Sequence, residues 1–226
     1  LIRRQRQMCI RDRLGIEPVL RTHVLALIAN NLARNEAELE EFFSQTFYAK
    51  QYGDLGELLA QAERVLNSLI AWKFVEAKEG KYKATRLGRR VVELYLDPLS
   101  AHLLIDTLAP RSTATPLGLL HLLTKCAEMF PLLHVSQRDW YELDEQAATR
   151  GNELFFAPPE PWSDEYEEFL RELKTALALE AWINEASEAS LLEEFRLTPG
   201  ELRARICLLY TSPSPRDLST ARMPSS

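Results

Sequence analysis

The first regular pattern of apolar and polar positions runs from residue 17 to residue 33, EPVLRTHVLALIANNLA. Apolar residues recur every three or four positions, which predicts an amphipathic helix. Its buried face is expected to carry Leu20, Val24, Leu27, Ile28 and Asn31. This helix opens the first of two differently patterned halves.

Two further helices follow in the first half. Asn35, with Glu38 three residues later, has the form of a capping box and predicts a helix through AELEEFFSQTFYAKQY. Asp54 is expected to cap a third helix, in which apolar residues keep a 3.6-residue period up to Ile70. The first half therefore begins with three consecutive helices.

The pattern then changes to that of a β-hairpin. WKFVEAKE and YKATRLG flank a turn expected at Gly80–Lys81. A fourth helix, RRVVELYL, is expected to end before Asp97–Pro98. Three helices, a two-stranded hairpin and a further helix follow each other in the order of a winged-helix domain, which we expect over residues 14–97.

From Pro98 onward the pattern is that of a helical bundle. Ser163 opens the longest predicted helix, whose inner face is expected to carry Phe169, Leu173, Leu177 and Ala181. A last helix is predicted from its N-cap Thr198, with Pro199 and Glu201 in its first turn, and is expected to end at Ile206. The fold class is thus mainly α: a winged helix followed by a truncated helical bundle over residues 98–206.

The two ends of the chain lack this pattern and are related to each other as DNA. CLLYTS (207–212) can be encoded by a sequence whose reverse complement, shifted by one base, reads QMCIRD (7–12). Such an inverted repeat resembles the mosaic end of a transposase-based sequencing library, whereas the alternative is a basic arm and a Ser/Pro tail. We favour adapter translation for residues 1–13 and 207–226 and leave them out of the fold.

Leaving out the two ends changes the charge balance. Residues 14–206 hold 20 Lys and Arg against 31 Asp and Glu, a net charge of −11 instead of −6. Cys126 remains as the single cysteine, which excludes a disulfide framework and suits a reducing cytosol. No apolar stretch approaches the roughly 18 residues of a membrane span. Nucleic acid would have to meet a local basic patch or parts of the protein outside this sequence.

Acidic and basic residues separate within the first half. The predicted third helix carries Asp54, Glu57 and Glu63 against Arg64 and Lys73, which favours packing on another domain over reading a DNA groove. The hairpin and the residues after it are basic. They hold Lys78, Lys81, Lys83, Arg86, Arg89 and Arg90 against Glu79. Two interpretations stay open for this run: a solvated hairpin tip, or a patch that contacts phosphates.

Motifs of catalytic chemistry are absent from the sequence. It contains no G-x-x-x-x-G-K-[ST] loop, G-x-G-x-x-G turn, H-E-x-x-H helix or C-x-x-C pair. His121, Cys126 and His134 form a loose grouping in a Leu-rich segment, where core packing is favoured over metal binding. We therefore predict no catalytic, cofactor-binding or metal-binding residue in this chain.

Several long segments nevertheless resemble one family. LGIEPVLRTHVLALIA, EFFSQTFYAKQY, ATRLGRRVVELYLDPLSA, LGLLHLLTKCAEMFPL and LKTALALEAWINEASEASLLEEFRLTPGELRARI are similar to the archaeal Hjm helicases, collinearly over 14–206. These are superfamily-two DNA helicases related to the helicase half of DNA polymerase theta. The resemblance implies two preceding RecA-like motor domains that use ATP and Mg²⁺, then a winged helix, and then a helical ratchet domain within which this chain stops.

The resemblance also implies a function and a site. The parent enzyme would unwind DNA with 3′-to-5′ polarity in replication or repair, as a cytoplasmic, nucleoid-associated monomer acting on single-stranded or branched DNA. Arg205 matches the family's strand-contacting ratchet arginine, with Arg203 two residues earlier on the same helix. A base-stacking tryptophan should follow where the adapter text stands. The candidate nucleic-acid contacts are Arg205, Arg203, Lys81, Lys83, Arg86 and Arg89.

Two alternatives come from other functional classes. A free-standing winged-helix regulator would need a basic recognition helix and a symmetric dimer, and the sequence supplies neither clearly. A protein-interaction scaffold would use the acidic surface to bind basic partners.

Overall fold

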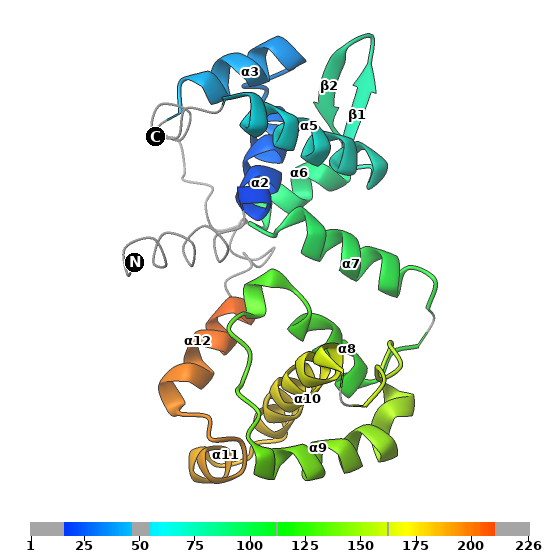
Figure 1. Ribbon diagram of the computed structural model, residues 1–226, viewed down its shortest axis with the longest axis vertical. Coiled ribbons are helices and arrows are strands. Elements are labelled where there is room, and N and C mark those ends of the chain that lie inside the picture. Colours follow the sequence, from blue (N-terminus) through cyan, green and yellow to red (C-terminus); the bar gives the residue numbers. More distant parts are fainter. Residues whose placement is uncertain (1–15, 47–54, 112, 162, 211–226) are drawn as a thin grey trace, which may run out of the picture. The chain divides into compact units, whose positions relative to one another are not determined.

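The computed structural model describes residues 16–46, 55–111, 113–161 and 163–210, and Figure 1 shows the arrangement of their helices and strands. The chain divides into two compact units, Leu1–His102 and Leu103–Ser226. Both are mainly helical, and the strands among the described residues form one antiparallel hairpin. The predicted fold class, helical with a small β-hairpin, is confirmed.

The first unit follows the predicted order of helices and hairpin. Its elements are α2 (Ile16–Ala29), α3 (Glu36–Ser44), α5 (Leu55–Ala71), β1 (Val75–Lys78), β2 (Lys81–Ala84), α6 (Arg86–Glu93) and the first part of α7 (Pro98–Leu108). α2 packs against α5 and α6. Leu25, Leu69 and Phe74 are fully buried at the centre of its core. Each such side chain stabilises the fold by about 1.5–3 kcal/mol relative to an exposed one.

Helix α2 ends earlier than predicted. Leu20, Val24, Leu27 and Ile28 are buried as expected. Asn31, however, lies beyond the helix with φ 58°, and its N–H bonds the carbonyl of Ile28 while Leu32 N–H bonds that of Leu27. This is a Schellman termination, and Asn tolerates the left-handed conformation that it requires. The placement of Asn31 on the buried face was wrong.

The predicted cap of α3 is present in a modified form. The side chain of Asn35 accepts a bond from Glu38 N–H, and the Glu38 carboxylate accepts from Arg34 N–H and from the Asn35 side-chain amide. The carboxylate thus reaches one residue further back than in a standard capping box. Asp54, the predicted cap of the third helix, lies outside the described residues.

The hairpin turn is shifted by one residue from its predicted position. Val75 pairs with Ala84 and Lys78 with Lys81, so the two-residue turn is Glu79–Gly80. Both turn residues have positive φ, 52° and 70°, as a type I′ turn requires. Lys81 is therefore the first residue of β2.

In the second unit α8, α9 and α11 pack against α10, the longest of the described helices, and α12 packs against η1 (Figure 1). Its elements after α7 are α8 (Pro116–Thr124), η1 (Ala127–Met129), α9 (Gln137–Arg150), η2 (Gly151–Glu153), α10 (Asp164–Ile183), α11 (Glu188–Phe195) and α12 (Pro199–Tyr210). Ser163 caps α10 as predicted, its hydroxyl accepting from Tyr166 N–H. Phe169 and Leu173 are buried, and Leu177 and Ala181 partly buried, on the expected face.

Helix α12 starts where predicted and runs further. The Glu201 carboxylate accepts from the backbone N–H and the hydroxyl of Thr198, and Glu201 N–H bonds the same hydroxyl. The helix continues to Tyr210, so the predicted end at Ile206 was wrong. Residues 207–210 extend it because CLLY contains no helix breaker. Among the described helices, none is both long and apolar enough to cross a bilayer.

Candidate nucleic-acid interface

The hairpin β1–β2, which we call the wing, has one packed and one basic face. Side chains alternate between the two faces of a strand. Tyr82 lies on the packed face, and its backbone N–H bonds the carbonyl of Arg34. The other face carries four exposed charges: Glu76, Lys78, Lys81 and Lys83. Pairing sets Lys78 opposite Lys81, and a weak contact of 3.3 Å joins Lys78 Nζ to Glu76 Oε2. With three lysines and one glutamate, the basic face has a net positive charge.

Helix α6 adds a row of arginines directly after the wing. Arg86, Arg89 and Arg90 recur at helical spacing and, with Glu93, line one shallow hollow. Arg90 is bonded to Glu93 at 3.0 Å. Arg86 and Arg89 are exposed, and neither forms an ion pair with any described residue. These two side chains are thus open to an external anion.

A glycine sets the position of this helix. A Cβ on Gly88 would lie 2.1 Å from the carbonyl oxygen of Phe74, so no larger residue fits without moving the backbone. The Thr85 hydroxyl caps α6 by accepting from Gly88 N–H at 3.0 Å and donates to the carbonyl of Lys73 at 2.9 Å. The arginine row is therefore held at a fixed angle to the wing.

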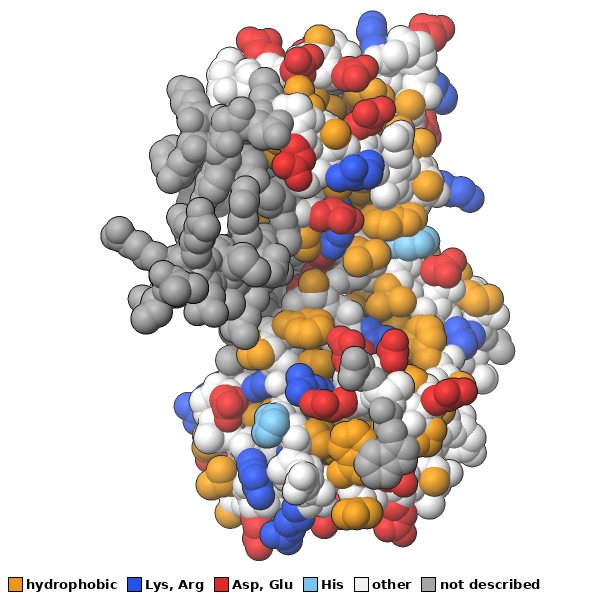
Figure 2. Space-filling model, viewed as in Figure 1, with side chains coloured by type: hydrophobic (Ala, Val, Ile, Leu, Met, Phe, Trp, Pro, Cys, Tyr) orange, Lys and Arg blue, Asp and Glu red, His pale blue; other side chains and the backbone are white. Residues whose placement is uncertain are grey.

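Helix α5 of the first unit carries exposed acidic side chains. Glu57 and Glu63 of α5 are exposed, and burial together with the charges of Glu36 and Glu63 raises the pKa of Tyr82. On the face drawn in Figure 2, acidic and basic side chains are interspersed, without one continuous basic field. A phosphate backbone can therefore be attracted only locally.

The two candidate arginines of α12 lie in different environments. Arg203 is 80% exposed, with its guanidinium 3.9 Å from the Glu188 carboxylate. Arg205 is only 8% exposed. Its Nη1 donates to the carbonyl of Glu201 at 3.1 Å and its Nη2 to that of Pro131 at 2.8 Å, while Nε is buried without a hydrogen-bond partner. Burial lowers the pKa of Arg205. Arg205 thus ties its helix to the segment after η1.

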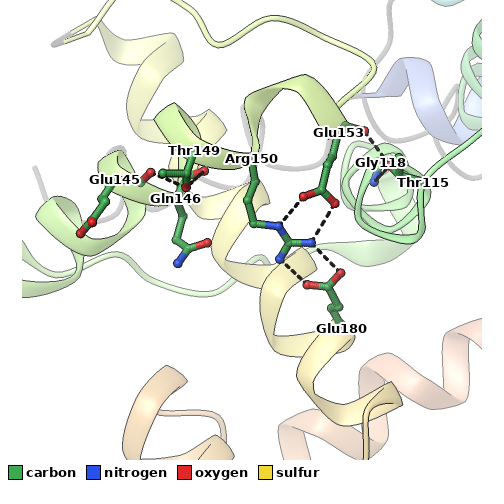
Figure 3. A network of polar contacts seen from close by, with 8 residues as sticks. All are labelled: Thr115, Gly118, Glu145, Gln146, Thr149, Arg150, Glu153 and Glu180. Atoms are coloured by element: carbon green, nitrogen blue, oxygen red, sulfur yellow. Dashed lines mark hydrogen bonds and ion pairs between the residues drawn. The ribbon is translucent and has the colours of Figure 1, made fainter.

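Two other arginines with little exposure to solvent are each neutralised by carboxylates. In the second unit, Arg150 is held between the carboxylates of Glu153 and Glu180, with nitrogen–oxygen distances of 2.7 and 2.9 Å to each (Figure 3). These bonds raise its pKa. In the first unit, Arg21 forms two bonds with Asp97, at 3.0 and 2.9 Å. Both guanidinium groups are therefore matched by carboxylates.

Arg205 differs in its charge balance. Within the ranges that the structure describes, no carboxylate oxygen lies within 4.0 Å of its guanidinium nitrogens. The carboxylate of Glu201, one turn earlier on α12, acts on it only electrostatically, and a buried charge without a direct ion pair is costly. An anion reaching the remaining N–H groups of Arg205 would therefore be favoured.

The histidine and cysteine grouping is dispersed in the core. His121 is fully buried, its ring edge against Phe169 and its Nε2 3.4 Å from the Glu172 carboxylate, which also binds Lys125 Nζ at 2.6 Å. The buried thiol of Cys126 donates to the carbonyl of Leu122 at 3.8 Å. No group of three potential metal ligands occurs in the described parts of the chain.

Sequence reasoning missed the partners of the buried charged groups. Arg21 and Asp97 are 76 residues apart, and Pro131 and Arg205 are 74 apart. Only the three-dimensional fold brings such residues together, and no local pattern signals them. The six candidate nucleic-acid contacts fall in two places: four on the wing and α6, two on α12. Their role stays a prediction.

Comparison with known proteins identifies similar sequences over most of the chain. Residues 117–207 match the family model described as archaeal helicase, domain 4. A protein of Methanocella arvoryzae named ATP-dependent DNA helicase Hel308 is 35% identical over 86% of this chain and 26% of its own length. Proteins of the same name from Methanocaldococcus jannaschii (36% identical, 87% of this chain, 15% of theirs) and Pyrococcus horikoshii (34%, 84%, 26%) are also similar. The chain thus spans about a quarter or less of these curated relatives.

Proposed function

Because this chain belongs to the archaeal Hel308 helicase family, we propose that it is an accessory, non-motor region of an ATP-dependent DNA helicase. The region packs on RecA-like motor domains and guides single-stranded DNA, while the parent enzyme unwinds DNA in the 3′-to-5′ direction during replication or repair. ATP and Mg²⁺ belong to the motors, and this chain hydrolyses nothing itself. The parent acts as a monomer in the cytoplasm, at the nucleoid.

The observation that carries this proposal is the charge balance of Arg205. Its guanidinium is buried and forms no ion pair with a described carboxylate, in contrast to Arg21 and Arg150; the carboxylate of Glu201 acts on it only electrostatically. A DNA phosphate supplies the missing negative charge and accepts hydrogen bonds from guanidinium groups. Arg203, exposed on the same helix, extends the contact along the strand.

The wing and α6 form a second contact with DNA. Lys81, Lys83, Arg86 and Arg89 are exposed. We assign them to backbone phosphates, which position DNA without reading its sequence. The acidic α5 then faces protein, where its Glu57 and Glu63 do not repel DNA. A stand-alone regulator would instead place this helix in the major groove, where its acidic side chains would be repelled by the DNA phosphates.

Fluorescence anisotropy with labelled oligo(dT) and with a forked duplex tests the proposal. Replacing Lys81, Lys83, Arg86 and Arg89 together by Gln should weaken binding to the fork and flatten its salt dependence by about 0.7–0.9 per lost phosphate contact. Arg64→Gln on α5 removes the same kind of charge from the acidic helix and should leave binding unchanged. Equal affinities for the wild type, the fourfold variant and Arg64→Gln would show that the wing does not contact DNA. A sequence-specific footprint on duplex DNA would favour the stand-alone regulator.

A further inference from the structure

The segment 130–135, between η1 and α9, is held by side chains from two other helices. Thr175 Oγ1 accepts from Leu133 N–H at 3.0 Å, and Lys174 Nζ donates to the carbonyl of His134 at 2.9 Å. Both residues belong to α10. From α12, Arg205 donates to the carbonyl of Pro131 at 2.8 Å. The segment is thus fixed along its length although it has no regular secondary structure.

Phe130 begins this segment and directs its ring outward. Its backbone N–H is bonded to the carbonyl of Ala127, yet the residue is 53% exposed. Exposing a phenyl ring gives up the stabilisation that burial would provide. A ring on a fixed backbone binds a flat partner at a small cost in conformational entropy. Phe130 is therefore preorganised for contact with a planar apolar group.

A shallow hollow continues from this ring. Its lining includes Phe130, Pro131, Glu167, Glu168 and Arg171. Glu167 is already paired with Arg171. The exposed carboxylate of Glu168 disfavours phosphate at its end of the hollow. An anionic strand would therefore bring its phosphate to the Arg205 side and only a neutral group, such as a base, into the hollow.

The fold brings the backbone beside Phe130 into contact with the buried cation. Arg205 binds the carbonyl of Pro131, the residue directly after Phe130, across 74 positions of sequence. An aromatic face beside a cation is the combination that binds single strands without regard to sequence. We propose that Phe130 stacks on a base of the single strand whose phosphate approaches Arg205, and that Arg205 also acts as the positioning residue of the Phe130 segment. This inference rests on the proposed function.

The test uses the 226-residue chain and two 5′-labelled 12-nucleotide strands: oligo(dT), and the same backbone with abasic sites at its central positions. Phe130→Ala should bind oligo(dT) roughly 5- to 100-fold more weakly, as expected for the loss of one stacked base. Phe130→Leu, which keeps an apolar side chain, should lose nearly as much, whereas Phe130→Trp should bind at least as tightly as the wild type. On the abasic strand all four proteins should bind alike.

Tyr141→Ala is the matched control. Tyr141 is 78% exposed on α9 in the same unit, and its loss should change neither affinity. If Phe130→Ala binds oligo(dT) like the wild type, or weakens binding equally on both strands, stacking by Phe130 is wrong. If in addition Arg203→Gln still weakens binding, the proposed function stands without this inference. Failure of the wild-type chain to bind either strand overturns both.

Discussion

Arg21 and Asp97, 76 residues apart, form a buried two-point ion pair that joins α2 to the start of α7. The Asp97 carboxylate also accepts from Leu99 N–H and so caps α7. One carboxylate thus neutralises a buried guanidinium and starts the next helix.

Asp97→Ala should therefore destabilise the first unit by about 3–5 kcal/mol, because it leaves the buried Arg21 charge with only the exposed carboxylate of Glu17 as a partner. Urea unfolding followed by circular dichroism and tryptophan fluorescence measures the change. Glu93→Ala, which breaks the exposed pair with Arg90, is the control and should cost less than about 1 kcal/mol. Equal, small losses in the two variants would show that the Arg21–Asp97 pair contributes little.

Gly88→Ala should lower the stability of the first unit by about 1–3 kcal/mol, because its Cβ would overlap the carbonyl oxygen of Phe74 and push α6 from the wing. Thermal unfolding reports the loss. Gly200→Ala in α12 meets open space and should be neutral or stabilising by up to about 1 kcal/mol. An unchanged melting temperature for Gly88→Ala would contradict the close packing of α6 on the backbone of Phe74.

Asp139 should give the second unit an acid-sensitive component of stability. Burial opposes its ionisation, but bonds from Lys174 Nζ at 2.7 Å and from Ser136 N–H at 2.9 Å outweigh this and lower its pKa from 3.8 to about 2. A pKa below that of the unfolded chain contributes stability at higher pH, which is lost as the pH falls through the folded value.

Asp139→Asn removes this titration. The difference in unfolding free energy between wild type and variant should therefore shrink by about 2 kcal/mol from pH 5 to pH 2. Urea unfolding across this range measures it. Glu145→Gln, which changes an exposed carboxylate on the same helix, is a control for general acid effects. A constant difference between wild type and Asp139→Asn would show that Lys174 does not hold the carboxylate ionised.

Local signals predicted most helix starts in this chain. Asn35, Ser163 and Thr198 were recognised as caps because each bonds residues only three positions away. Helix ends and turns were less accurate. The hairpin turn was displaced because Glu79 adopts a positive φ that is uncommon for its type, and α12 was ended too early.

The candidate site was only partly accessible from sequence. The exposed basic residues of the wing and α6 could be read from their spacing. The burial of Arg205 and its bond to Pro131 could not, because they depend on how α12 packs beside η1. Phe130 was missed for the same reason: only the fold shows that it is exposed and that the next residue, Pro131, is bonded by Arg205.

The most direct test of the account is the salt dependence of oligo(dT) binding by the wild type, Arg205→Gln and Arg205→Lys. Loss of one phosphate contact should flatten the slope of log affinity against log salt by about 0.7 for Arg205→Gln, whereas Arg205→Lys should keep most of the slope. Circular dichroism confirms that both variants fold. If Arg205→Gln binds with the wild-type affinity and slope, Arg205 does not meet the strand, and guidance of single-stranded DNA by α12 is wrong.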